Sequence, residues 1–273
     1  MNFDAEEALC TGDPQRALAI LQSVIREQPG DAKLRVFLFQ LLCVLGQWER
    51  AAAQLELCAQ MDPAALPMRE TYHDAIGCER LREDVFAGLR SPLLFGEPDV
   101  WVALLVESLL RAGRDEATAA ERLRQDAFAQ APMSSGTIDG EAFDWIADAD
   151  MRLGPVLEAV VNGRYYWIPF ARLARIDVEE ATDLRDAVWV PAHLVFSNGG
   201  ETLALIPTRY PGSQSSSDGL LALARKTAWD EVTPGVFHGS GQRVLATDRG
   251  EYPLLDVRHI VLAANPGVGE RHG

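Results

Sequence analysis

Two stretches in the first half of the chain repeat the same spacing of apolar, small and polar positions. The stretch GDPQRALAILQSVIREQP (12–29) aligns with GQWERAAAQLELCAQMDP (46–63) at a constant offset of 34 residues. The offset superimposes Gly12 on Gly46, Arg16 on Arg50, Ala17 on Ala51, Leu21 on Leu55 and Pro29 on Pro63. A period of 34 residues is typical of tetratricopeptide helix pairs, in which glycine ends one helix and proline stops the next. The pattern therefore predicts a helical repeat.

A weaker third copy follows later in the same half. The stretch GRDEATAAERLRQDAFAQAP (113–132) places Ala119 and Leu123 at twice the 34-residue offset from the small and apolar positions of the second copy, although its closing proline comes one residue late. An apolar stretch of helical periodicity precedes it. One more helix is expected over 71–88, and a loop over 89–98.

Stacked helix pairs bury a shared core and leave a concave groove, which the first helix of each pair lines. Grooves of this kind commonly hold an extended peptide or an amphipathic helix. On the second pair, this geometry gives as groove candidates Lys33, Val36, Gln40, Cys43 and Val44. The three apolar candidates could equally belong to the core. Lys33 and Gln40 are more informative, because polar side chains there have no core role.

After Pro132 the helical period gives way to short β-rich runs separated by turn signals. The segment VLEAVVNGRYYWIP (156–169) is two apolar runs joined by Asn-Gly, the strongest short hairpin signal. Further strands are expected within 187–211, 236–248 and 252–263, and a short helix over 220–229. The sequence thus predicts an α+β chain with three parts: a tetratricopeptide-like helical repeat domain (1–132), a β-rich, small barrel-like domain (133–263) and a flexible tail (264–273).

The charge of the chain narrows the classes of partner. Its 25 basic and 40 acidic residues give a net charge of −15, which argues against nucleic acid as main partner and against an anionic membrane surface. No apolar run reaches the length of a membrane helix, and the first residues do not resemble a secretion signal. The four cysteines form no CxxC pair and suit a reducing compartment. We therefore expect a cytoplasmic protein without a cofactor.

Clustered carboxylates make FDWIADADMRLGPVLE (143–158) the main candidate for chemistry. Asp144, Asp148 and Asp150 could hold a divalent metal and serve a hydrolase. Their spacing does not fit a calcium loop, and the chain has no phosphate loop, no HExxH motif and no complete nucleophile elbow.

The alternative is a structural role for these acids. Arg152 follows the cluster closely, and DLRDAVW (183–189) repeats the Asp/Arg texture with Asp183 and Arg185. Two such stretches favour an internal Arg–carboxylate brace that includes Asp148, Asp150 and Arg152.

Several motifs resemble the ImpE/TagJ family of type VI secretion accessory proteins. They are FLFQLLCVLGQWERA, ADADMRLGPVLEAVVNGRYYWIPF, DLRDAVWVPA, LIPTRYPGS and GQRVLATDRGEYPLLDVRHI, which run in the family's order over nearly the whole chain. The resemblance implies a non-enzymatic adaptor that binds an N-terminal helix of the small sheath subunit and links the sheath to its ClpV-type AAA+ ATPase. It supplies no catalytic residues.

The sequence leaves open which half binds the partner. An aromatic set in the second half, Tyr165, Tyr166, Trp167 and Trp189, could be exposed at an interface, although filling the core of a small barrel is the better-supported interpretation. Oligomeric state, strand order and direct contact with the ATPase are also open.

Overall fold

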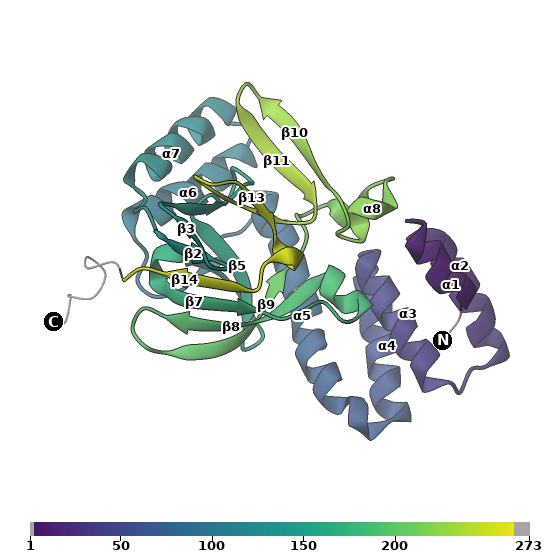
Figure 1. Cartoon of the computed structure of the whole chain (residues 1–273). Helices are drawn as coiled ribbons and strands as arrows, with labels where there is room; N and C mark the ends of the chain where they lie inside the picture. The colour runs from purple at the N-terminus through teal and green to yellow at the C-terminus, as the bar shows by residue number, and fades with distance from the viewer. Residues whose placement is uncertain (1–2, 265–273) are drawn as a thin grey trace.

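The computed structural model describes residues 3–264, which form a helical half followed by a strand-rich half (Figure 1). The helices are α1 (Phe3–Cys10), α2 (Pro14–Glu27), α3 (Ala32–Val44), α4 (Trp48–Met61), α5 (Leu66–Phe86), α6 (Val100–Ala112), α7 (Ala117–Gln130) and α8 (Gly219–Ala222). Single 3-10 turns are η1 (Pro63–Ala65), η2 (Phe170–Arg172), η3 (Leu184–Ala187), η4 (Ser213–Ser215) and η5 (Leu254–Asp256). The predicted α+β class is confirmed.

The 34-residue repeat corresponds to two stacked helix pairs, α1–α2 and α3–α4. Gly12 and Gly46 follow the first helix of each pair with φ angles of 80° and 64°, the left-handed conformation that ends a helix. The small and apolar positions shared by the two copies are all buried: Ala17, Ala51, Leu21 and Leu55. The predicted helical repeat is therefore confirmed.

The third pair, α6–α7, is present with a shifted register. Its buried positions on α7 include Ala120 and Arg124, one residue later than the predicted Ala119 and Leu123. The connection before α7 is also longer: α7 begins four residues after Gly113, whereas α2 and α4 each begin two residues after the preceding glycine. Asp115 in this turn has a left-handed φ of 61°. The single helix expected over 71–88 is the long α5.

The strands form three sheets. They are β1 (Leu93–Leu94), β2 (Gly136–Ile138), β3 (Glu141–Phe143), β4 (Ile146–Asp148), β5 (Val156–Val161), β6 (Arg164–Pro169), β7 (Leu173–Val178), β8 (Trp189–Phe196), β9 (Glu201–Pro207), β10 (Thr227–Thr233), β11 (Val236–Gly241), β12 (Val244–Thr247), β13 (Glu251–Pro253) and β14 (His259–Leu262). Nine strands follow the order β1-β6-β5-β9-β8-β7-β14-β2-β3; β13-β12-β4 and β10-β11 form the other two sheets. No pairing within residues 3–264 joins β1 to β3, so the barrel-like sheet is open.

The hairpin predicted from the Asn-Gly turn is confirmed. Asn162 and Gly163 have φ angles of 48° and 71° and join β5 to β6, as a two-residue hairpin turn requires. The helix expected over 220–229 is wrong beyond its first turn. Ala224 takes a left-handed φ of 52° and ends α8, and the following residues form β10, which pairs with β11.

One hydrophobic core cluster contains residues of both halves, and the buried residues of a second cluster all lie in the strand-rich half. Trp48 and Tyr72 from the helices lie against Trp189 of β8, with ring centroids 6.0 and 5.8 Å apart. The Trp189 indole also donates a hydrogen bond of 3.0 Å to Glu79 on α5. Tyr165 and Trp167 are likewise buried, so these aromatics belong to the core, while Tyr166 is half-buried. In addition β1, from the predicted loop over 89–98, pairs with β6.

The boundary predicted between 132 and 133 falls between α7 and β2, but it stays a prediction, because the shared core crosses it. The predicted flexible tail lies outside the described residues, apart from Ala264. No helix within residues 3–264 is long and apolar enough to cross a membrane.

Candidate functional site

A groove of about 800 Å³ opens where the helical repeat meets the strand-rich half. One wall comes from α1, α3 and α4; the other comes from η3, the end of α8 and η5. In Figure 1, α3 lies beside the segment that precedes β8, and η3 in that segment packs against it. The apolar side chains along the groove include Leu34, Val36, Phe37, Leu184, Leu223 and Leu255.

Helix α3 presents one stripe of residues to the groove. Lys33, Val36, Phe37 and Gln40 line it, and their spacing of three, four and seven residues places them on one helix face. The stripe runs from an exposed ammonium group at the rim, past two half-buried apolar side chains, to Gln40, which is 9% exposed. Asp31 fixes the start of α3 by accepting hydrogen bonds from the backbone N–H groups of the first turn.

Two of the five groove candidates do not line the groove. Cys43 and Val44 are fully buried, because the strand-rich half encloses this end of α3: η3 packs against the helix, and Arg209 contacts its last residues. Their carbonyl oxygens accept hydrogen bonds of 2.9 and 2.6 Å from the guanidinium of Arg209. Burial lowers the pKa of Arg209 to about 10 and raises that of the Cys43 thiol. These two residues hold the helix in place rather than meeting a ligand.

The side-chain amide of Gln40 makes no hydrogen bond within residues 3–264. Two other polar groups that line the groove are occupied. Arg225 donates to the carbonyl oxygen of Leu9 at 2.6 Å, and Asp183 is ion-paired with Arg185. Gln40 is therefore the polar side chain of α3 that lies deep in the groove and has no partner inside the protein.

Sequence reasoning missed the second wall, which the strand-rich half supplies. The members of the predicted brace at Asp183 and Arg185 build this wall. The Asp183 carboxylate accepts the backbone N–H of Arg185 at 2.8 Å and forms a capping box with Asp186. The Arg185 guanidinium then lies 4.8 Å from the ring of Tyr72 on α5. These contacts fix Leu184 and Ala187 beside the groove.

The aspartates at 148 and 150 are both engaged, but not with the same arginine. Asp150 pairs with Arg152 and accepts the backbone N–H of Gly239 at 2.8 Å. Asp148 does not pair with Arg152. Its carboxylate pairs with Arg243 and accepts the Tyr210 hydroxyl at 3.0 Å. Burial raises the pKa of Asp148, and Arg243 opposes that rise.

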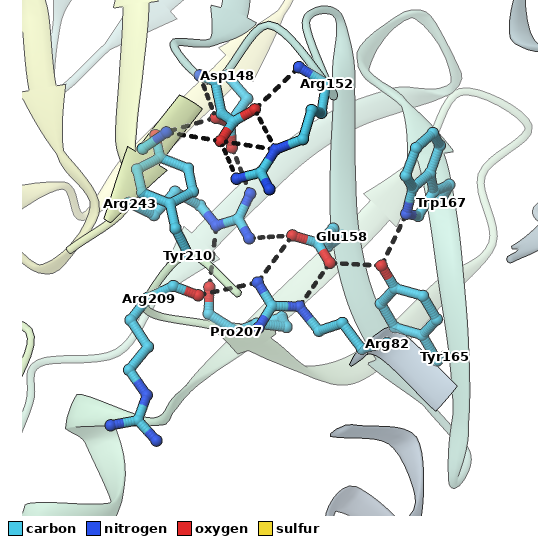
Figure 2. Close-up of polar contacts among 12 residues, drawn as sticks. Arg82, Asp148, Arg152, Glu158, Tyr165, Trp167, Pro207, Arg209, Tyr210 and Arg243 are labelled. Atoms are coloured by element: carbon cyan, nitrogen blue, oxygen red, sulfur yellow. Dashed lines mark hydrogen bonds and ion pairs between the residues drawn. The ribbon is translucent and has the colours of Figure 1, made fainter. Parts of the chain in front are cut away.

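A buried network centred on Glu158 extends this pairing toward the helices (Figure 2). The Glu158 carboxylate accepts 2.7 and 3.1 Å hydrogen bonds from Arg82 of α5, and it also accepts bonds from Arg243 and Tyr165. Burial alone would raise the pKa of Glu158, but Arg82 and Arg243 outweigh it and lower the pKa to about 2. Arg82 also donates to the carbonyl oxygen of Arg209 at 2.8 Å, which connects the network to α3.

The metal site proposed at Asp144, Asp148 and Asp150 is not assembled. Arginines and a hydroxyl already occupy the carboxylates of Asp148 and Asp150, while Asp144 is exposed. Within the part of the chain that the structure describes, no three His, Cys, Asp or Glu side chains come together in a way that could hold a metal ion.

Comparison with known proteins agrees with the architecture. Residues 140–261 match the ImpE protein family, and residues 8–66 match the tetratricopeptide repeat. The chain is 48% identical over 257 residues to the type VI secretion system accessory component TagJ of Pseudomonas aeruginosa, covering 94% of this chain and 90% of that protein. The chain belongs to the ImpE family. A crystal structure of protein VPA1032 from Vibrio parahaemolyticus is similar to this ImpE-family fold, with a TM-score of 0.87 and 25% identity over 96% of this chain and 98% of that one.

Proposed function

We propose that this ImpE-family chain is a non-enzymatic accessory component of a bacterial type VI secretion system, and that its groove holds a helix of the small sheath subunit. The observation that carries the proposal is an apolar groove at a tetratricopeptide-type repeat in a chain 48% identical to TagJ. Amphipathic helices bind such grooves through their apolar face. Val36, Phe37 and Leu184 offer that face a half-buried apolar surface.

The groove has the dimensions for a short helical contact. From Lys33 to Gln40 the stripe on α3 spans seven residues, about 10 Å at 1.5 Å per residue. A helix docked along it would present about two turns.

The buried acidic residues of the strand-rich half support a structural rather than a catalytic role for this half. Asp148, Asp150 and Glu158 are each buried against at least one arginine, and none lines the groove. We therefore do not propose the metal-dependent hydrolase, and no catalytic residue is assigned.

The direct test is retention of the small sheath subunit from the same secretion gene cluster by the immobilised full chain. Val36→Glu places a charge in the apolar stripe, and we expect it to weaken retention at least tenfold. Leu203→Glu is the matched control, because Leu203 is 72% exposed on β9 and lies outside the groove. Equal retention by wild type and Val36→Glu would contradict the groove assignment, and no retention by wild type would contradict the function.

We further propose that the chain acts in the cytoplasm and links the sheath to the ClpV-type AAA+ ATPase. The support is the family resemblance, and no residue is assigned to this contact. The test is recovery of the ATPase on immobilised sheath subunit, with and without the full chain. We expect the chain to increase recovery; equal recovery without it would contradict the link.

A further inference from the structure

Among the residues that line the groove, Gln40 is the polar residue that is nearly buried and has a side-chain amide without a hydrogen-bond partner in the described part of the chain. Its side chain is nine-tenths buried, it lines the deep end of the groove, and its amide makes no hydrogen bond within residues 3–264. The amide oxygen and nitrogen of Gln40 do not belong to the fully buried polar atoms without a partner, so both still reach water in the groove of the free chain. A ligand that fills the groove would remove that water. The amide is therefore free to exchange hydrogen bonds with an occupant of the groove.

The surroundings of Gln40 indicate what would satisfy it. The stripe beside it on α3 is apolar at Val36 and Phe37, and η3 places Leu184 and Ala187 on the opposite wall. A charged ligand group would lose its hydration in such a setting without gaining an opposite charge. A neutral donor–acceptor group can exchange hydrogen bonds with a carboxamide at no such cost.

We propose that Gln40 selects the occupant of the groove. The bound helix carries one neutral hydrogen-bonding side chain, a carboxamide or a hydroxyl, within its apolar stripe and opposite Gln40. This inference deepens the proposed function and rests on it for the identity of the occupant. The principle is that a buried amide rejects an all-apolar ligand, because binding that ligand removes water from the amide without replacing its hydrogen bonds.

Lys33 adds a second position to the same recognition pattern. Its ammonium group forms no ion pair within the described residues and lies at the rim, two helical turns from Gln40. A helix docked along α3 that meets Gln40 with its neutral polar residue therefore meets Lys33 about seven residues away. The carboxylates of Asp31 and Asp62 also line the groove, so Lys33 indicates a polar position of the bound helix but not the sign of its charge.

The test is selection of helical peptides from a displayed library by the purified full chain. The library fixes an amphipathic helix and varies each position of its apolar stripe among Leu, Ile, Asn, Gln, Ser and Thr. We expect the wild type to enrich a carboxamide or hydroxyl at one stripe position, and Gln40→Leu to enrich Leu or Ile at that position. Gln130→Leu is the control, since Gln130 is exposed on α7 and lies outside the groove.

The affinities of the selected peptides complete the test. Replacing the selected polar residue by leucine should weaken binding to the wild type about tenfold, and should leave binding to Gln40→Leu unchanged or tighter. Apolar residues enriched by the wild type at every stripe position would overturn the proposal. So would a polar preference that persists in Gln40→Leu. A wild type that enriches no helix would overturn both this proposal and the groove assignment.

Failure of the proposed function gives a different result. If the wild-type chain retains no sheath subunit but still selects helices with one polar residue opposite Gln40, the sheath assignment is wrong while the role of Gln40 stands. Thermal unfolding of Gln40→Leu supplies a readout independent of any ligand. Its midpoint should stay close to that of the wild type, because the Gln40 amide makes no hydrogen bond within residues 3–264; a clearly lower midpoint would show that Gln40 has a structural role.

Discussion

At the scale of single residues, a buried network of opposite charges connects strand β5 to helix α5. Glu158 lies in the middle of β5, in a strand whose other side chains are apolar and buried. It faces Arg82 and Arg243, both almost fully buried. Such a network stabilises a fold little in comparison with an apolar core, but removing one member weakens the pairing of the buried charges that remain. Glu158 therefore matters for holding one arrangement of the two halves.

Glu158→Gln should lower the free energy of unfolding by about 1–3 kcal/mol, since two buried guanidinium groups lose a shared carboxylate while each keeps one partner, Glu79 for Arg82 and Asp148 for Arg243. Urea unfolding at pH 7 measures the loss. Glu116→Gln is the matched control: its ion pair with Arg111 is about 40% exposed, and such a pair contributes roughly 0–1 kcal/mol. A loss below about 1 kcal/mol for Glu158→Gln would contradict the proposed role of the network.

Glu158 also predicts how the free energy of unfolding changes with pH. The pKa of Glu158 is lowered from 4.5 to about 2 in the folded chain, so the unfolded chain binds the proton more readily. Its contribution to stability is fully present above about pH 4.5 and is lost as the pH falls toward 2. The difference in unfolding free energy between wild type and Glu158→Gln should therefore shrink across this window. If this difference in unfolding free energy grows as the pH falls, the lowered pKa of Glu158 in the folded chain is contradicted.

At the scale of elements, local patterns were predictable and contacts between distant segments were not. The 34-residue offset and the Asn-Gly turn depend on neighbours in sequence, and both helices and hairpin formed as expected. Helical periodicity also placed Lys33, Val36 and Gln40 on the groove face. The same periodicity cannot show that η3, some 140 residues further on, packs against α3, or that the strand-rich half encloses the end of this helix. That is why Cys43 and Val44 lie in the core.

Helix α3 depends on its N-cap, and this gives an element-scale prediction. The Asp31 carboxylate accepts the backbone N–H groups of Lys33 and Leu34 at 2.8 and 3.2 Å. Asp31→Ala should lower the free energy of unfolding by about 1 kcal/mol, whereas Asp31→Asn, which can still cap, should change it little. Denaturant unfolding of the three chains measures both effects. Equal losses for Ala and Asn would show that the cap is not the cause.

At the scale of the whole molecule, the groove exists because two differently built halves pack into one body. Its walls come from both halves, and the core beneath it joins Trp48 and Tyr72 to Trp189. The repeat predicted one wall of the groove. The other wall and the buried arginine network could not be read from the sequence, because their members are far apart along the chain and carry no common spacing.

A shared core predicts cooperative unfolding. Far-ultraviolet circular dichroism, which reports mainly the helices, and tryptophan fluorescence should give the same thermal midpoint in the full chain. Segment 1–132 expressed alone should lack a cooperative transition, because it exposes its part of the shared cluster. Segment 133–264 keeps the second core cluster and should unfold at a lower temperature than the full chain. Two separate midpoints in the full chain would contradict a single body and would support the predicted division into independent domains.

The central claim, that the groove between α3 and η3 holds a helix of the sheath subunit, can be tested through a native probe. Cys10 is exposed and lines the groove, whereas Cys43, Cys58 and Cys78 are buried. The rate at which a maleimide modifies Cys10 in the full chain should fall at least tenfold when the small sheath subunit saturates it, and should not fall with Val36→Glu. A complex that forms while Cys10 reacts at its free rate would contradict the claim.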